Sequence, residues 1–183
     1  MLRIFFVLAL LMPMAAIAQN DIYEVKSGEI HFFSEAPQEL ISASSKSLKG
    51  FLDVRRKTFA FKIDIASFLG FNNQLQRGHF NENYMESSIY PAATYKGKII
   101  EDIDFSKDGN YDVRTKGKLN IHGVEQERII KVVLTIKKGK LTASSNFVVL
   151  LTDHNIKIPR VVNDKLSPEI KVTLDATLQP QTK

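Results

Sequence analysis

The chain has 183 residues, with 25 Lys and Arg against 20 Asp and Glu, a formal net charge of +5, and no cysteine. The lack of cysteine excludes disulfides, iron–sulfur clusters, thiol catalysis and a cysteine-linked lipid anchor. Because the positive charge falls in short clusters such as Arg55-Arg56-Lys57, we interpret it as solvated turns and expect no nucleic-acid partner, while a weak, transient contact with a membrane surface stays open.

The first eighteen residues predict a secretory signal peptide. Arg3 supplies a positive region, Ile4 to Met12 an apolar run, and Ala16-Ile17-Ala18 an A-x-A cleavage site. The run is shorter than the roughly 20 residues that span a bilayer. We therefore divide the chain into a signal peptide, residues 1–18, and one domain, residues 19–183, expected to be periplasmic or secreted and soluble after the signal peptide is removed.

Alternating apolar and polar residues predict strands in the first part of the domain. The segments are Ile22 to Phe33, with a bulge or bend at Gly28, then Leu40 to Ser45, Leu48 to Val54, and Phe59 to Ala66. In the last of these, Phe59, Phe61 and Ile63 share the apolar face. That strand is expected to have one buried face and one in water.

One helix is predicted, over Gln74 to Ser87. Asn72 or Asn73 can cap its start, and Pro91 prevents it from running into the next strand. Leu75, Phe80, Tyr84 and Met85 recur at helical spacing and predict one apolar face. A single helix among many strands is expected to close or line one end of a barrel or sandwich.

The remaining segments predict a run of strands linked by turns. They are Thr94 to Ile103, Tyr111 to Ile121, Glu127 to Ile136, Leu141 to Leu151 and Ile170 to Leu178. Asp108-Gly109 and Gly123 predict tight hairpin turns, and Asp153 to Pro168 forms a long connection. About eight antiparallel strands predict an all-β meander closed into a barrel, whose interior is either packed or holds one small ligand.

Motifs for catalysis are lacking. The chain contains no H-E-x-x-H motif, serine elbow or phosphate-binding glycine loop, and its four histidines fall in separate segments. The acidic pairs Asp102/Asp104 and Glu125/Glu127 lie at polar hairpin ends, where solvated charge is usual. We therefore expect no enzyme activity, no metal and no cofactor. An enzyme acting on a bound lipid would need polar groups inside the barrel beyond Thr115 and Ser145.

Three motifs in order resemble the YceI-like family of exported bacterial proteins. The first is HFNENYMES at His79 to Ser87, followed by YPAATYKG at Tyr90 to Gly97. The second is GKLNIHGV at Gly117 to Val124, with Arg128 four residues on. The third is DHNIKIP at Asp153 to Pro159. Together they cover most of the domain.

The resemblance implies an extended eight-stranded antiparallel lipocalin-like barrel, capped at one end by the helix, that binds an isoprenoid, a quinone-like lipid or another amphiphile. Residues expected to point inward and contact the tail are Phe32, Phe59, Phe61, Ile63, Phe80, Tyr84, Met85, Tyr95, Val113, Leu119, Phe147, Val149, Val172 and Leu174. Candidates for contacting a headgroup are Arg77, His79 and Asn83.

Two functional hypotheses follow. The first is an exported, non-catalytic protein that holds a lipid for transport, storage or stress protection. The second is a ligand-free interaction or stress-response module with a packed barrel, which would expose an apolar patch near the helix or the Asp153 to Pro168 connection. Ligand identity, oligomeric state and physiological role do not follow from the sequence.

Overall fold

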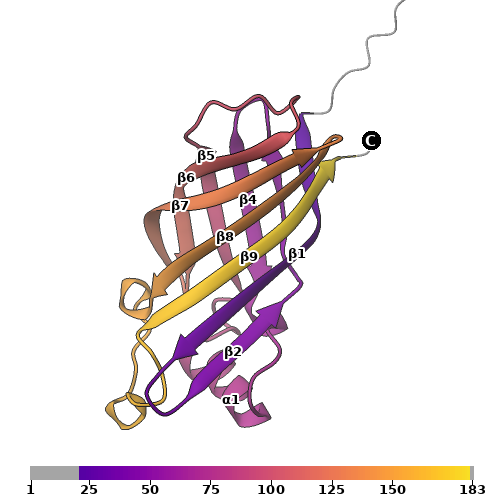
Figure 1. Ribbon diagram of the computed structural model, residues 1–183. Helices are drawn as coiled ribbons and strands as arrows, with labels where there is room; N and C mark the ends of the chain where they lie inside the picture. The colour runs from indigo at the N-terminus through magenta and orange to yellow at the C-terminus, as the bar shows by residue number, and fades with distance from the viewer. Residues whose placement is uncertain (1–20, 182–183) are drawn as a thin grey trace, which may run out of the picture.

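The computed structural model describes residues 21–181, so the predicted signal peptide, residues 1–18, lies outside the described residues. The chain forms an antiparallel barrel with α1 (Gln74–His79) at its lower end in Figure 1 and with short helical turns at η1 (Ile65–Ser67), η3 (Leu151–His154) and η4 (Arg160–Val162). The strands are β1 (Ile22–Glu35), β2 (Leu40–Ser45), β3 (Lys49–Asp53), β4 (Thr58–Asp64), β5 (Ala92–Ile99), β6 (Gly109–Ile121), β7 (Val124–Lys137), β8 (Lys140–Leu150) and β9 (Glu169–Pro180). This all-β architecture confirms the predicted class.

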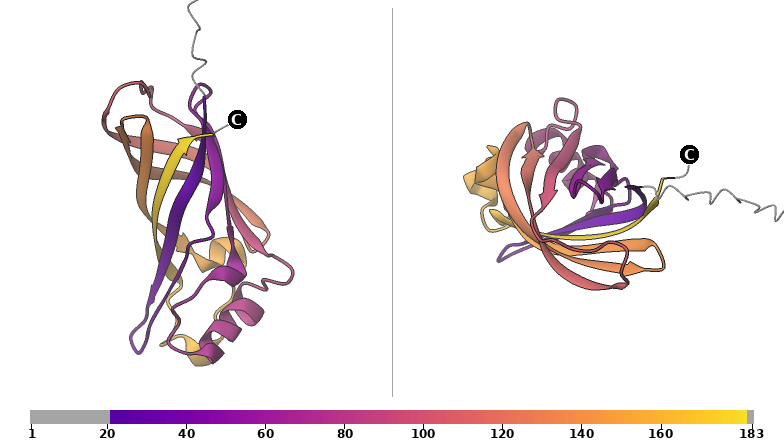
Figure 2. Two further views of the ribbon diagram at one scale, coloured as in Figure 1. Left: turned by 90° about the vertical axis from the view of Figure 1, so that its right-hand side faces the viewer. Right: turned by 90° about the horizontal axis from the view of Figure 1, so that it is seen from above.

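β1 closes the barrel. On one side it pairs with β9, and on the other with β2 near its end and with β3 near its start. Because β2 and β3 lie end to end along β1, they act as two halves of one strand, and the closed barrel formed by residues 21–181 is eight-stranded, as predicted. Figure 2 shows the curved wall from the side and from above.

The break between β2 and β3 places Leu48 inside the barrel. The hydroxyls of Ser45, Ser47 and Ser67 lie within hydrogen-bonding distance of one another at this break. Gly28 of β1 faces Leu48, and a Cβ on Gly28 would lie 2.7 Å from Leu48 Cδ2. The bulge expected at Gly28 is instead between Val25 and Ser27, so Gly28 makes room for a side chain and does not kink the strand.

The helical segment is shorter than predicted and changes its winding partway. α1 spans Gln74–His79, and its cap is Asn73, whose side chain accepts a hydrogen bond from the Gln76 amide. It continues as a π turn, η2 (Phe80–Tyr84), with a bond from the Met85 amide to the Phe80 carbonyl. The segment therefore ends before the predicted Ser87.

Two of the turns are tight. His122-Gly123 and Lys138-Gly139 join their strands through positive φ angles, and the former confirms the predicted turn at Gly123. The tight turn predicted at Asp108-Gly109 was wrong, because β6 begins at Gly109 and a connection over residues 100–108 precedes it. Since Ile99 pairs with Thr115, the first part of β6 extends beyond β5, and a longer connection must cover that distance.

Apolar side chains are buried together at the upper end of the barrel. Tyr23, Val113, Ile136, Leu141 and Leu178 are buried there, in a single cluster of apolar side chains. Leu141 is paired with Leu178 on the neighbouring strand. Within residues 21–181, no helix is long and apolar enough to cross a bilayer.

One part of the wall lacks a strand ladder. β7 and β8 pair only where Val133–Lys137 meets Lys140–Ser144, next to their hairpin. We call the remaining boundary, between residues 124–132 of β7 and 145–150 of β8, the seam. Side chains bridge it: Ser145 Oγ donates to the Lys131 carbonyl at 2.6 Å, and Arg128 Nη2 donates to the Val148 carbonyl at 2.7 Å.

Candidate functional site

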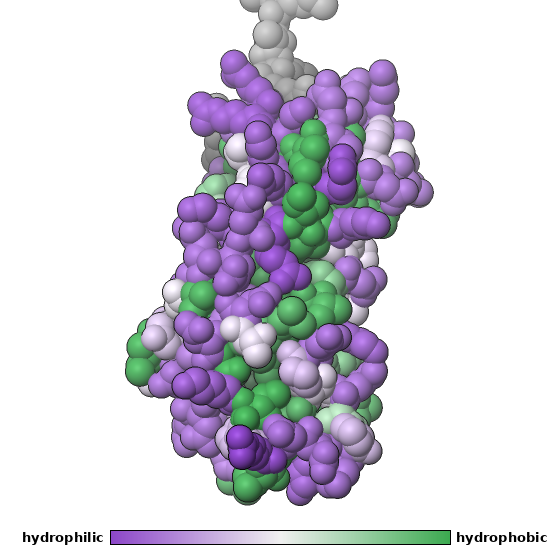
Figure 3. All heavy atoms as spheres, turned by 90° about the vertical axis from the view of Figure 1, so that its left-hand side faces the viewer, coloured by the Kyte–Doolittle hydropathy of each residue, from purple (hydrophilic) through white to green (hydrophobic). Residues whose placement is uncertain are grey.

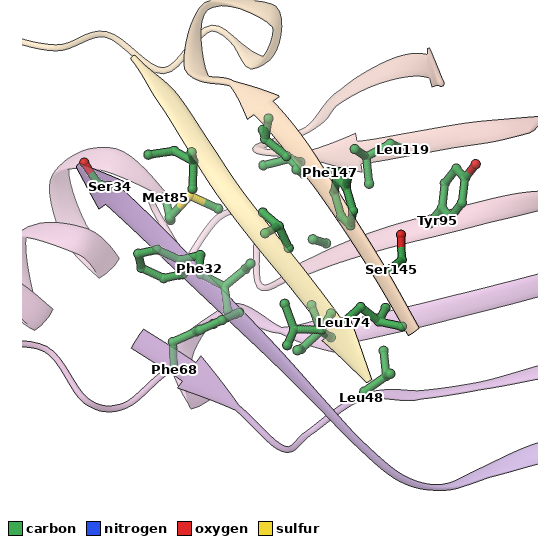
Figure 4. Close-up of a pocket in the computed structure, with 18 of the residues that line it drawn as sticks. Phe32, Ser34, Leu48, Phe68, Met85, Tyr95, Leu119, Ser145, Phe147 and Leu174 are labelled. Atoms are coloured by element: carbon green, nitrogen blue, oxygen red, sulfur yellow. The ribbon is translucent and has the colours of Figure 1, made fainter. Parts of the chain in front are cut away.

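The barrel interior is not fully packed. A cavity of about 560 Å³ extends from the barrel interior to the helical segment and is lined mostly by aliphatic and aromatic side chains. Figure 4 shows Phe32, Leu119 and Phe147 projecting from separate strands toward this space. The volume falls within the range of about 300–1,000 Å³ that is typical of small-molecule pockets.

Most of the predicted inward residues lie on this cavity. The lining includes Phe32, Phe59, Phe61, Ile63, Phe80, Tyr84, Met85, Tyr95, Leu119, Phe147, Val149, Val172 and Leu174. Val113 points inward but not into the cavity: it is buried in the apolar cluster at the upper end, because it lies on the part of β6 that extends beyond β5. Strand alternation predicts the inward face but not how far along it the hollow reaches.

Four phenylalanines fix the helical segment over the lower end of the cavity. The rings of Phe32 and Phe80 stack with centroids 5.4 Å apart, and Phe71 lies 5.0 Å from Phe80. Phe68 completes the group, 5.4 Å from Phe32 and 5.9 Å from Phe80. The π turn keeps Tyr84 and Met85 on the same inner side as Phe80, so the helical segment contributes an apolar surface to the cavity.

The cavity meets solvent beside α1. Its exposed lining residues are Lys62, Asn73, Leu75, His79 and Lys165, most of them on α1 or on the connection between β8 and β9. We call this end the mouth. Glu39 braces it, accepting a hydrogen bond of 2.9 Å from Gln76 Nε2. The connection is also held, because the Gln38 amide donates to the Asp164 carbonyl.

Of the predicted headgroup residues, the structure places only His79 on the cavity lining. Arg77 lies elsewhere: its Nη2 donates to the Ala66 carbonyl at 3.0 Å and ties α1 to the segment before it. Asn83 is exposed on the outer side of the π turn. π winding begins only at Phe80, so it changes the facing of Asn83 but not that of Arg77, which lies within α1. Leu75 lines the mouth but is 68% exposed, so it is not part of a buried face.

The polar groups inside the barrel are engaged with the backbone. Thr115 Oγ1 donates to the Ile130 carbonyl at 3.0 Å, and the Tyr95 hydroxyl lies 3.0 Å from Thr115 Oγ1. Burial raises the pKa of Tyr95 above its ordinary value, so the phenol stays neutral. With Ser145 bonded to the Lys131 carbonyl, these hydroxyls stabilise the wall around β7. They form no nucleophile–base pair.

A histidine pair ties the exit of the helical segment to the barrel rim. His122 Nε2 lies 2.6 Å from Glu86 Oε2, and His122 Nδ1 donates to the His154 carbonyl at 3.1 Å. His154 is fully buried; its Nδ1 donates to the Val124 carbonyl, while its Nε2 has no hydrogen-bond partner among residues 21–181. Burial lowers the pKa of His154 below its ordinary value. Over the same residues, no group of three or more His, Asp or Glu side chains is arranged to hold a metal ion.

Several lining residues did not figure in the sequence prediction. Phe68 and Phe71 were missed because they lie in the irregular segment before the helix, although an aromatic F-L-G-F run just before a helix cap is a usable signal. Gln76 and Lys165 at the mouth had no sequence signal, since they come together only when α1 meets the β8–β9 connection. The sequence identified Arg128 only as part of a family motif. Its contact across the seam, to the Val148 carbonyl, depends on the fold.

A closed antiparallel barrel with an apolar cavity open at one end defines the class of barrels that enclose small ligands. Within that class, the YceI-like domain model matches residues 23–178, and the chain belongs to the YceI-like family. The resemblance found in the sequence motifs is thereby confirmed. No curated protein matches the chain.

Solved structures share the fold at low sequence identity. A polyisoprenoid-binding domain from Saccharophagus degradans, implicated in plant cell wall breakdown, superposes with a TM-score of 0.74 at 14% identity, covering 87% of this chain and 98% of that one. Burkholderia cenocepacia BcnA gives a TM-score of 0.67 at 14% identity, covering 82% and 95%. A mutant of the Campylobacter jejuni YCEI protein gives 0.52 at 20% identity, covering 69% and 74%.

Proposed function

We propose that the protein is an exported, non-catalytic carrier that holds a long-chain isoprenoid or similar amphiphilic lipid in the cavity, with residues 1–18 removed on export. The observation that carries this proposal is the shape and lining of the cavity: an apolar space of about 560 Å³, lined mostly by aliphatic and aromatic side chains and open beside α1. The polyisoprenoid-binding domain from Saccharophagus degradans shares this fold and supports the choice of ligand class.

The physical basis is burial of the lipid tail. Each methylene moved from water into an apolar lining gains about 0.8 kcal/mol, so a long tail gains enough to outweigh the loss of its conformational freedom. The polar residues lie at the mouth, where Gln76, His79 and Lys165 can meet a hydrated headgroup. A tail inside with its head at the mouth is the orientation that this distribution favours.

Native mass spectrometry of the protein purified from the periplasm, followed by organic extraction and lipid analysis, tests the proposal. We expect a stoichiometric adduct that extracts as an isoprenoid or quinone-like lipid. A protein that carries no adduct, and acquires none on incubation with such lipids, would overturn the carrier function and favour an interaction module.

A pair of tryptophan substitutions tests whether the cavity is the binding site. Leu174 lines the cavity, whereas Val113 lies in the buried apolar cluster at the upper end. We expect Leu174→Trp to fill the space, lowering lipid occupancy with little loss of stability. Val113→Trp should instead overpack the core and cost about 1–3 kcal/mol in urea unfolding while occupancy of the folded fraction is retained. Equal occupancy in the two variants would contradict the assignment.

A further inference from the structure

The outer face of β3 to β7 carries a concentration of positive charge. Register places the outward residues of these strands in cross-strand rows. We call the cations on these rows the lysine wall: Lys49, Lys62, Lys96, Lys98, Arg114, Lys116, Lys118 and Lys131. With strands about 4.8 Å apart, the rows extend roughly 19 Å around the barrel. Figure 3, which views the molecule from the left-hand side of Figure 1, shows hydrophilic residues on both sides of a broken band of hydrophobic ones.

Within the lysine wall, cations face cations directly. Lys49 pairs with Lys62, Lys96 with Lys118, Lys98 with Lys116, and Arg114 with Lys131. Like charges directly opposite on neighbouring strands destabilise a sheet. Four facing pairs of cations are a reason to look for a partner that compensates the charge left over after the protein's own ion pairs.

The protein neutralises only part of this charge itself. Lys116 and Lys118 are paired with Glu127 and Glu125 at 2.8 and 2.7 Å, and Arg114 with Glu101 at 2.8 Å. Three aspartates also lie at outward positions of these strands: Asp53 faces Arg56, Asp64 accepts a hydrogen bond from the Ala66 amide, and Asp112 is exposed. The side chains of Lys49, Lys62, Lys96, Lys98 and Lys131 form no ion pair with any residue between 21 and 181.

The composition of the wall favours a lipid surface as its partner. Its unpaired cations are all lysines, which act as point charges, whereas bidentate recognition of a defined phosphate calls for arginine. Phe51 lies on the same row as Lys96 and is 52% exposed. Aromatic rings are enriched where proteins meet the lipid headgroups, so Phe51 suits a lipid surface. Stacking on a nucleic acid would require several such rings.

We propose that the part of the lysine wall on β4 and β5, Lys62, Lys96 and Lys98, docks the protein on an anionic lipid bilayer. Lys62 belongs both to the wall and to the cavity lining, so the docking surface adjoins the binding site. This inference rests on the proposed carrier function. Docking in this orientation would bring the cavity to the membrane that supplies or receives its lipid.

Flotation with vesicles tests the docking. We expect the purified protein to bind vesicles of phosphatidylglycerol mixed with phosphatidylcholine, not vesicles of phosphatidylcholine alone, and to dissociate as the salt approaches about 1 M. The triple variant Lys62→Gln, Lys96→Gln, Lys98→Gln should bind the anionic vesicles roughly 100-fold more weakly. It should melt no lower than the parent, because it removes like-charge repulsion.

A matched control removes the same charge elsewhere. Lys137→Gln, Lys138→Gln, Lys140→Gln changes three lysines of the β7–β8 hairpin and should leave vesicle binding unchanged. Equal loss in both triple variants, or displacement of the protein from vesicles by a lower concentration of duplex DNA, would overturn the proposal.

Lipid extraction from the same preparations separates the two functions. A protein that carries lipid but does not bind anionic vesicles would refute docking and leave the carrier function intact. Vesicle binding that requires the lysine wall in a protein that never acquires lipid would support docking and refute the carrier function.

Discussion

His154 is fully buried, and the lowering of its pKa by burial gives the free energy of unfolding a pH dependence with a definite sign. Burial lowers its pKa in the folded state, while the unfolded chain titrates near the ordinary value of about 6.5. Below that value the unfolded state binds a proton that the folded state does not. The free energy of unfolding should therefore fall with falling pH, by at most about 1.4 kcal/mol per pH unit from this residue.

Urea unfolding from about pH 7.5 to 5.5 measures this effect across the ordinary histidine range. His154→Asn keeps a donor for the Val124 carbonyl but cannot take up a proton, so its stability should fall less over this interval than that of the parent. His79→Asn, at an exposed position, should retain the parent's pH dependence. If His154→Asn and the parent lose stability in parallel, His154 is not the source.

Gly123 and Gly139 form a matched pair of turn glycines. Both have φ of +72°, but a Cβ on Gly123 would lie 2.5 Å from the Tyr90 ring, whereas a Cβ on Gly139 meets open space. Gly139→Ala should cost only the left-handed backbone penalty, about 1–2 kcal/mol. Gly123→Ala should cost clearly more, because the Tyr90 ring must also move. Denaturant midpoints measure both, and equal costs would mean that the ring moves freely.

Among the elements, the helical segment is anchored to the barrel by the ring of Phe80. Phe80 contacts Phe32, Phe68 and Phe71, so Phe80→Ala should destabilise the protein by about 3 kcal/mol and reduce lipid retention. Leu75→Ala, on the same segment but largely exposed, should change stability by less than about 0.5 kcal/mol. Equal effects would show that the aromatic cluster does not anchor the segment.

The seam is the element boundary held by side chains. Arg128 donates to the Val148 carbonyl and lies 3.5 Å from Asp153. Arg128→Ala should cost about 1.5–3 kcal/mol and speed amide exchange in residues 145–150. Arg114→Ala, which removes an exposed pair with Glu101, should cost less than about 1 kcal/mol. Unchanged exchange beside the seam in Arg128→Ala would mean that other contacts hold it shut.

Strands were predictable from the sequence where one face is buried and the other is exposed to solvent. Tyr111 to Ile121 alternates without interruption and appears within β6. The break between β2 and β3 falls between the predicted segments Leu40 to Ser45 and Leu48 to Val54, but their role as two halves of one strand was not predicted, because it depends on their pairing with β1. The tight turn predicted at Asp108-Gly109 was wrong for a related reason. Turn residues do not show that β6 extends beyond the end of β5.

At the scale of the whole molecule, closure of the barrel was predictable and the division of its interior was not. Alternation placed Val113 and Leu119 on the same inner face of β6, yet one lies in packed core and the other on the cavity. The hollow depends on which side chains meet across the barrel, and thus on register between strands far apart in sequence. The helix and its inward residues Phe80, Tyr84 and Met85 could be predicted from the sequence, but its change to π winding could not.

Closure by β1 and β9 also dictates when the fold can form. Ile22–Glu35 comes first among the described strands, and Glu169–Pro180, its partner along most of its length, comes last. No shorter stretch of chain completes the barrel, so folding should be slow for a domain of this size, on the order of milliseconds to seconds. Until then β1 presents a bare edge beside an uncovered aromatic interior, a combination prone to aggregate. Deleting Glu169–Pro180 should therefore yield aggregates rather than a smaller barrel.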